Sequence, residues 1–134
     1  MSKTLQNLKK AFEGESQAYM KYSFYAKQAK KDGLPIVKDV FEETMKNEKE
    51  HAKIWFKKIK ELDSTATNLF DAMKGELYES TEMYIQFAEE AREEGYEEIA
   101  QLFEEVADIE DSHYLRFAQH KTFPILPGTS RIAI

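Results

Sequence analysis

Two short stretches of this sequence place a histidine three residues after a glutamate: His51 follows Glu48, and His113 follows Glu110. On a helix, residues three apart lie on one face about a turn apart, so a carboxylate and an imidazole can bind the same metal ion. Both pairs fall where their helices should otherwise be apolar. The two stretches therefore predict metal ligands inside a helical core.

Four helices are predicted to position these pairs, and glycine or proline residues mark most of the breaks between them. In each helix, apolar residues recur at alternating steps of three and four, which is typical of a helix that buries one face in a bundle. The predicted ranges are 2–31, 35–62, 65–94 and 96–121. The sequence therefore predicts an all-α four-helix protein.

Polar side chains interrupt the apolar face near the middle of every helix. They are Glu15, Glu48, His51, Glu76, Glu79, Glu110 and His113. Carboxylates gathered in one core repel one another and cost several kcal/mol each to desolvate, unless cations neutralise them. One glutamate from each of two helices plus Glu-x-x-His from each of the other two is the ligand arrangement of ferritin-like dimetal proteins. We therefore expect a ferritin-like four-helix bundle that binds two metal ions.

Ligands that are mostly oxygen, with a minority of imidazole, suit iron or manganese better than a structural zinc site, which favours thiolates. The sequence contains no cysteine, so thiolate ligands, disulfides and thiol catalysis are excluded. We expect two iron ions, with manganese or zinc as substitutes. The alternative is a structural bundle in which these polar residues bind no metal.

The composition limits the partners and the location. A formal net charge of −6 without a basic patch argues against nucleic acid. No stretch approaches the roughly 20 apolar residues of a membrane span, and residues 1–10 lack an apolar signal region. We expect a cytoplasmic protein without membrane contact, with one helical domain over 1–121 and a non-helical tail over 122–134 that prolines interrupt.

Two tyrosines lie close to the predicted ligands along the chain. Tyr22 is seven residues beyond Glu15, and Tyr84 is five residues beyond Glu79. Each can be a simple core aromatic, or it can donate a hydrogen bond to a carboxylate that binds metal.

The two halves of the chain repeat one order of features, in which a helix, a turn with glycine and a helix with Glu-x-x-His follow one another. This order suggests an internal duplication of a helical hairpin, with a pseudo-twofold site. If the pseudo-twofold axis runs across the bundle, the second and third helices are parallel. Their link must then span helices about 40 Å long, whereas the residues near 63–68 reach only about 20 Å.

The short link therefore predicts a domain-swapped homodimer. In this dimer, the ligands of the first half of one chain meet those of the second half of the other. The first set is Glu15, Glu48 and His51, and the second set is Glu76, Glu79, Glu110 and His113.

Four stretches of the sequence closely resemble the rubrerythrin family, and the similarity covers roughly residues 3–120. They are 13–18 (EGESQA), 47–53 (NEKEHAK), 75–84 (GELYESTEMY) and 91–100 (AREEGYEEIA). The resemblance implies a non-haem diiron peroxidase that reduces hydrogen peroxide to water in the oxidative-stress defence of oxygen-sensitive microbes.

The resemblance also implies roles for individual residues. Glu48 and Glu110 resemble the family's bridging carboxylates, and the resemblance makes Glu15, Glu76 and His113 terminal ligands. Glu79 resembles the extra carboxylate that exchanges with His51 on one iron as the redox state changes. Glu79 and His51 are thus candidate catalytic residues, as are Tyr22 and Tyr84.

One feature of the family has no counterpart in this sequence. Rubrerythrins usually end in a rubredoxin module that holds iron in four cysteines, and this sequence has none. We therefore expect an external electron donor, such as a rubredoxin. The alternative function is a ferritin-like ferroxidase or iron-handling protein, and the extra carboxylate Glu79 favours the peroxidase.

Overall fold

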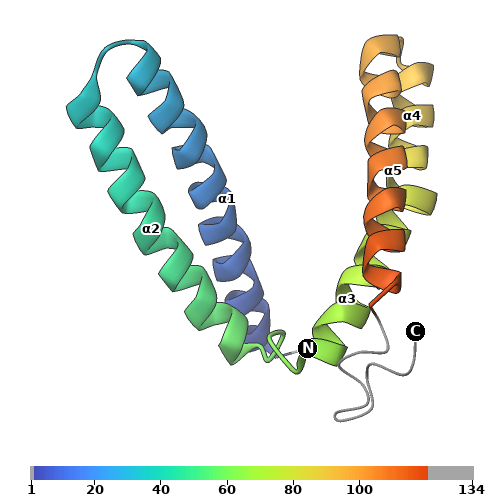
Figure 1. The fold of residues 1–134 in the computed structure, drawn as a ribbon, viewed down its shortest axis with the longest axis horizontal. Coiled ribbons are helices and arrows are strands. Elements are labelled where there is room, and N and C mark those ends of the chain that lie inside the picture. Colours follow the sequence, from blue (N-terminus) through green and yellow to red (C-terminus); the bar gives the residue numbers. More distant parts are fainter. Residues whose placement is uncertain (1, 121–134) are drawn as a thin grey trace. The chain divides into compact units, whose positions relative to one another are not determined.

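A computed structural model describes residues 2–120, and these residues form helices without any strand (Figure 1). The elements are α1 (Lys3–Lys31), α2 (Pro35–Lys58), α3 (Thr65–Tyr78), the π-helix η1 (Glu79–Met83), α4 (Tyr84–Glu93) and α5 (Glu97–Ala118). The predicted all-α class is confirmed, and the helices are those expected of a ferritin-like bundle. The predicted tail, 122–134, lies outside the described residues.

The first hairpin consists of α1 and α2. Gly33 ends α1 with a positive φ of 73°, and the amide of Leu34 donates to the carbonyl of Ala29 at 2.9 Å. This is the hydrogen-bond pattern of a helix end that requires a left-handed residue, which glycine adopts without strain. Pro35 then begins α2, where its fixed φ and missing N–H cost nothing.

The second hairpin consists of α3, η1 and α4, followed by α5. Its turn repeats the first: Gly95 has a φ of 88°, and the amide of Tyr96 donates to the carbonyl of Ala91 at 2.8 Å. Beside this turn, small side chains let the helices approach closely. They form a cluster of Ala88, Ala91 and Ala100, against which Phe103 packs.

The helix predicted over 35–62 is shorter in the structure, because α2 ends at Lys58. Lys60 takes a left-handed φ of 59°, its amide donates to the carbonyl of Lys57, and the amide of Glu61 donates to that of Phe56. These two bonds cap the carbonyls of the last turn and direct the chain out of the helix. The predicted helix end near Leu62 was therefore wrong by about one turn.

The single regular helix predicted over 65–94 was also wrong in its middle, where the π-helix η1 replaces one α-turn. The amide of Tyr84 donates to the carbonyl of Glu79, five residues back, as a π-turn requires. The carbonyl of Leu77 accepts from the hydroxyls of Ser80 at 3.2 Å and Thr81 at 2.7 Å. Side-chain hydroxyls thus support the widened turn.

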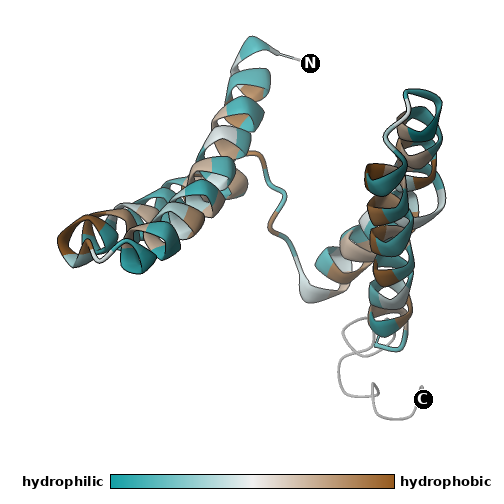
Figure 2. Cartoon of the chain, turned by 90° about the horizontal axis from the view of Figure 1, so that it is seen from above, coloured by the Kyte–Doolittle hydropathy of each residue, from teal (hydrophilic) through white to brown (hydrophobic). Residues whose placement is uncertain are grey.

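The chain divides into two compact units, residues 1–62 and 63–134, and each contains one of the hairpins. Among the described residues, no large side chain is fully buried, and the buried hydrophobic residues are alanines together with Met73. Figure 2 shows hydrophobic positions interspersed with hydrophilic ones along the helices of both units. None of the helices between residues 2 and 120 combines the length and hydropathy that a membrane span requires.

Candidate metal centre

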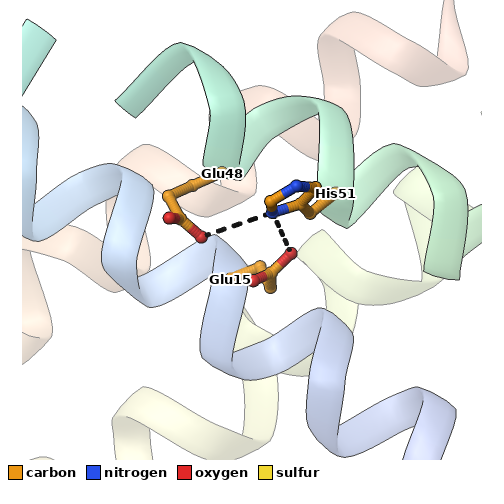
Figure 3. Close-up of side chains that lie close together, drawn as sticks. All are labelled: Glu15, Glu48 and His51. Atoms are coloured by element: carbon orange, nitrogen blue, oxygen red, sulfur yellow. Dashed lines mark ion pairs between the residues drawn. The ribbon is translucent and has the colours of Figure 1, made fainter. Parts of the chain in front are cut away.

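The first hairpin brings together three of the predicted ligands, Glu15 from α1 and the pair Glu48 and His51 from α2 (Figure 3). The His51 Nδ1 atom lies 3.2 Å from Glu15 Oε2 and 3.9 Å from Glu48 Oε2. One ligand atom from each residue falls within 4.8 Å of the others. The three-residue spacing on α2 places its two side chains on the face that meets α1.

The second hairpin brings together the corresponding three residues, Glu76 from α3 and the pair Glu110 and His113 from α5. The His113 Nδ1 atom lies 3.2 Å from Glu110 Oε1 and 3.5 Å from Glu76 Oε1. Each hairpin therefore holds two carboxylates and one imidazole in a group that could hold one metal ion.

Glu79 is the additional carboxylate of the second hairpin, and it lies at the first position of η1. Burial, a hydrogen bond with Glu110 and the charges of Glu110 and Glu76 raise the pKa of Glu79 to about 7, although His113 opposes the rise. The metal-free second hairpin therefore retains a proton on this carboxyl group close to neutral pH.

Burial is also the largest cause that raises the pKa of Glu48 in the first hairpin, and a hydrogen bond with Glu15 and its charge add to it. His51 opposes this rise. Both hairpins thus hold a carboxyl group whose pKa is raised because it is desolvated beside other carboxylates. A cation bound in either group would favour the ionised carboxylates and so lower these pKa values.

The residues present fit divalent metal ions. In each group one carboxylate oxygen, Oε2 of Glu15 or Oε2 of Glu76, is buried without a hydrogen-bond partner. The 3.2 Å approach of His51 Nδ1 to Glu15 Oε2 is close without being a hydrogen bond. A buried carboxylate oxygen without a partner is costly, and a metal ion would satisfy it. The oxygen-rich ligands favour iron or manganese.

The two predicted tyrosines have different surroundings in the structure. Tyr84 lies close enough to Glu79, Glu110 and Glu76 for their charges, together with burial, to raise its pKa. Tyr22 packs against the rings of Tyr25 and Phe41, with centroids 6.2 and 5.9 Å away. Tyr84 therefore lies beside the carboxylates of the second group, whereas the described contacts of Tyr22 are aromatic.

The π-turn that carries Glu79 was missing from the sequence prediction, as were the hydroxyls of Ser80 and Thr81 that support it. The spacing of the glycines in the sequence does indicate an extra residue in this helix. The distance from Gly14 to Gly33 is 19 residues, whereas that from Gly75 to Gly95 is 20. A helix that keeps the same apolar face over one extra residue must widen a turn, and a π-turn does this.

The helical fold and the paired carboxylate and histidine groups define a class, that of all-α proteins with a candidate dimetal carboxylate site. Residues 6–121 match the family model described as Rubrerythrin, so the chain belongs to the rubrerythrin family. Membership of this family, together with the two groups, supports a diiron protein of the oxidative-stress defence kind with an oxidoreductase role.

Relatives of known name agree with this assignment. The chain is 44% identical over 129 residues to rubrerythrin of Nitratidesulfovibrio vulgaris, covering 87% of the chain and 68% of the relative. It is 43% identical to rubrerythrin of Porphyromonas gingivalis, covering 87% of the chain and 64% of that protein. Nigerythrin of N. vulgaris is 30% identical over 85% of the chain. The chain thus spans about two thirds of the length of these relatives.

Proposed function

We propose that the chain is a non-haem diiron peroxidase that reduces hydrogen peroxide to water. The observation that carries this proposal is Glu79, a carboxylate beyond the two matched groups, placed by a π-turn within hydrogen-bonding reach of Glu110. The reaction consumes two electrons and two protons for each peroxide and produces two waters. The site must therefore deliver both electrons and protons.

Six residues would hold the two iron ions: Glu15, Glu48, His51, Glu76, Glu110 and His113. When bound, iron would supply the two electrons that the reduction of peroxide needs. The resemblance to the family makes Glu48 and Glu110 the residues shared by both ions. We propose that His51 and Glu79 would be alternative ligands at one ion, because the carboxylate would suit ferric ion and the neutral imidazole would suit ferrous ion.

Residues of the chain itself would supply protons to the reaction. The carboxyl group of Glu79 holds its proton up to a pKa of about 7 in the metal-free structure. Bound cations would lower this pKa, so in the loaded site Glu79 would be an ionised carboxylate that can accept a proton and pass it on. We propose that Glu79 passes protons to the oxygens released from peroxide, and that the hydroxyl of Tyr84 orients the carboxylates beside it.

The electrons must come from a donor, because the 134 residues contain no cysteine that could hold a further iron site. We propose a donor outside these residues, such as a rubredoxin. A cytoplasmic location, expected from the sequence, stays a prediction.

Stopped-flow oxidation of the reduced, iron-loaded protein tests this function. Peroxide should restore the absorbance of the oxidised protein at least about tenfold faster than dioxygen at equal concentration, which corresponds to about 1.4 kcal/mol in activation free energy. Zinc-loaded protein is the control, because zinc has no redox chemistry and should give no signal. Equal rates with the two oxidants would contradict the peroxidase proposal.

The alternative function, a ferroxidase or iron-handling protein, would give a different result in the same apparatus. Dioxygen would then oxidise ferrous ion added in excess over the site, turnover after turnover, and the product would be retained as ferric mineral. A native mass near that of a 24-subunit shell would support this alternative.

A further inference from the structure

The extra residue between Gly75 and Gly95 can be located from packing within the second hairpin, where α3, η1 and α4 all pack against α5. Met73 and Ser80, each 7% exposed, lie seven residues apart, which is about two turns of a regular helix. Ala88, 2% exposed, follows Ser80 by eight residues, and a regular helix would turn it about 80° away from that face. The extra residue must therefore be accommodated between Ser80 and Ala88.

These buried positions alone leave more than one place for the wide turn, which could begin at Glu79, as it does, or one turn later within α4. The choice decides where Tyr84 points. In a regular α-helix, residues five apart lie about 140° apart around the axis, whereas in a π-turn five residues complete about one turn. Only a wide turn between Glu79 and Tyr84 therefore puts these two side chains on one face.

The observed turn gives Glu79 and Tyr84 this common face. The amide of Tyr84 donates to the carbonyl of Glu79. Burial first, and next the charge of Glu79, raise the pKa of Tyr84, so the carboxyl group lies near the phenol. The ring of Tyr84 stacks on Phe103 of α5, with the ring centroids 5.9 Å apart. A wide turn placed after Tyr84 would rotate its side chain away from both neighbours.

Two hydroxyl groups lie at the start of the wide turn, on the only serine and threonine between Gly75 and Gly95 in the sequence. The hydroxyls of Ser80 and Thr81 both donate to the carbonyl of Leu77, at 3.2 and 2.7 Å. A hydroxyl that donates to a carbonyl of the preceding turn competes with backbone amides for that oxygen and bends the helix. Two hydroxyls on one oxygen therefore weaken the regular turn at this place and favour the wider one.

The first hairpin shows the same part of the helix without these hydroxyls. Counted from the first-helix glutamate, Tyr19 and Met20 occupy the places of Ser80 and Thr81. The helix α1 is a regular α-helix over its whole length. The wide turn thus occurs in the hairpin that has the serine and the threonine.

Single hydroxyls elsewhere leave their helices regular. Ser16 donates to the carbonyl of Phe12 in α1, and Thr44 donates to the carbonyl of Val40 in α2, each at 2.7 Å. Both stretches are α-helical. One hydroxyl on a carbonyl is therefore not sufficient to widen a turn, and Thr44 is a matched control for Thr81.

We propose that Ser80 and Thr81 are positioning residues for the candidate metal centre. Their hydroxyls hold the wide turn at residues 79–83, and the turn keeps the Tyr84 hydroxyl on the face of the carboxylates. This inference rests on the proposed function, in which Tyr84 orients these carboxylates. The placement of the turn can be measured in the metal-free protein, without any reaction.

Hydrogen exchange of backbone amides in the metal-free whole chain tests whether the hydroxyls hold the turn. In the Ser80→Ala, Thr81→Val double variant, the amide of Tyr84 should exchange at least about tenfold faster than in the wild type, because the turn loses two hydrogen bonds. Thr81→Ser keeps both hydroxyls and should keep the wild-type exchange rate. Thr44→Val removes a hydroxyl bond of the same length from α2 and should leave the amide of Tyr84 unchanged. Circular dichroism checks that each variant remains helical.

The rate of peroxide reduction at equal iron content tests whether the hydroxyls act through Tyr84. The double variant should be about threefold slower than the wild type, the loss expected when the Tyr84 hydroxyl no longer reaches the carboxylates. In a Tyr84→Phe background, the same two substitutions should cause no further slowing, because their effect passes through that hydroxyl. Thr81→Ser and Thr44→Val should both react at the wild-type rate.

An unchanged exchange rate of the Tyr84 amide in the double variant would overturn the inference. Equal slowing by the double substitution with and without Tyr84→Phe would overturn it as well, because a general loss of helix stability acts in both backgrounds. A wild-type protein that shows the exchange difference but fails to reduce peroxide would contradict only the proposed function.

Discussion

The two hairpins of this protein share one order of helices, turn and ligands, and one spacing within that order differs between them by a single residue. From the turn glycine to the second-helix glutamate there are 15 residues in both copies, Gly33 to Glu48 and Gly95 to Glu110. From the first-helix glutamate to the turn there are 18 residues after Glu15 but 19 after Glu76. The added residue therefore lies on the first helix of the second hairpin.

The structure shows where this residue is absorbed. The π-helix η1 takes it up, and after it the buried positions of the two hairpins correspond again, as Ala26 and Ala29 do to Ala88 and Ala91. At the start of the widened turn stands Glu79, three residues after Glu76, whereas Ala18 stands three residues after Glu15. One insertion thus coincides with an extra carboxylate while the ligands common to both hairpins keep their places.

The ligands common to both hairpins predict equal effects from equivalent substitutions. Glu15→Gln and Glu76→Gln each remove a carboxylate with a buried unpartnered oxygen. Each should weaken metal binding by at least about 100-fold, because loss of a residue that only supports a ligand already costs up to about that much. Each should also reduce turnover to background. Metal titration followed by equilibrium dialysis measures this. A large effect from one variant and none from the other would break the equivalence of the hairpins.

The added carboxylate predicts an effect confined to the second hairpin. Glu79→Ala makes this position equal to Ala18, and it should lower the rate of peroxide reduction by about 100-fold, similar to the loss of one preorganised charged or hydrogen-bonding group. The metal content should change little, because the six shared ligands remain. Glu82→Ala is the matched control, since Glu82 lies exposed in the same π-turn. An unchanged rate in Glu79→Ala would remove Glu79 from the reaction.

Much of this comparison could be predicted from the sequence, because metal ligands and the buried residues of a helix recur at helical spacing. The Glu-x-x-His pairs and the glutamates of the first helices were predicted, and the structure groups them as Glu15 with Glu48 and His51, and Glu76 with Glu110 and His113. The all-α class followed from the spacing of apolar residues, which is a property of each helix alone.

Other features could not be read in this way, because they depend on competition between local hydrogen bonds. Whether α2 continues to Leu62 or stops at Lys58 depends on a left-handed residue, and a lysine at position 60 gives no sign of one. The π-turn conserves the apolar pattern by widening the helix, so the pattern itself hides it. Only the unequal spacing from the first-helix glutamate to the turn glycine, 18 residues after Glu15 and 19 after Glu76, reveals the insertion.

The carboxyl groups also predict how the stability of the metal-free protein depends on pH. The pKa of Glu79 is about 7 in the folded state and near its ordinary value of 4.5 when unfolded. Between these values the folded state binds the additional proton, so its stability is full below about pH 4.5 and falls as the pH rises through 7. The loss should be about 1–2 kcal/mol after allowance for solvent screening.

Urea unfolding of the metal-free protein at pH 5 and pH 7.5 measures this change. Glu79→Gln should remove most of the pH dependence, because glutamine does not titrate. The raised pKa of Glu48 contributes with the same sign from the first hairpin, so a smaller dependence should remain. Stability that rises with pH in the metal-free wild type would contradict the raised pKa of both groups.

The smallest expected difference between the hairpins concerns the two corresponding tyrosines, which lie eleven residues before Gly33 and Gly95. The Tyr84 pKa is raised by burial and by three carboxylates nearby, whereas Tyr22 lies against Tyr25 and Phe41. Tyr84→Phe should therefore slow peroxide reduction about threefold, within the 0.5–1.5 kcal/mol of a typical hydrogen bond, and Tyr22→Phe should have less effect. Steady-state rates of the two variants at equal iron content compare them directly. If Tyr22→Phe is the slower enzyme, the hydroxyl of Tyr22 acts on the carboxylates in the assembled site, and the asymmetry of the hairpins is limited to the insertion and Glu79.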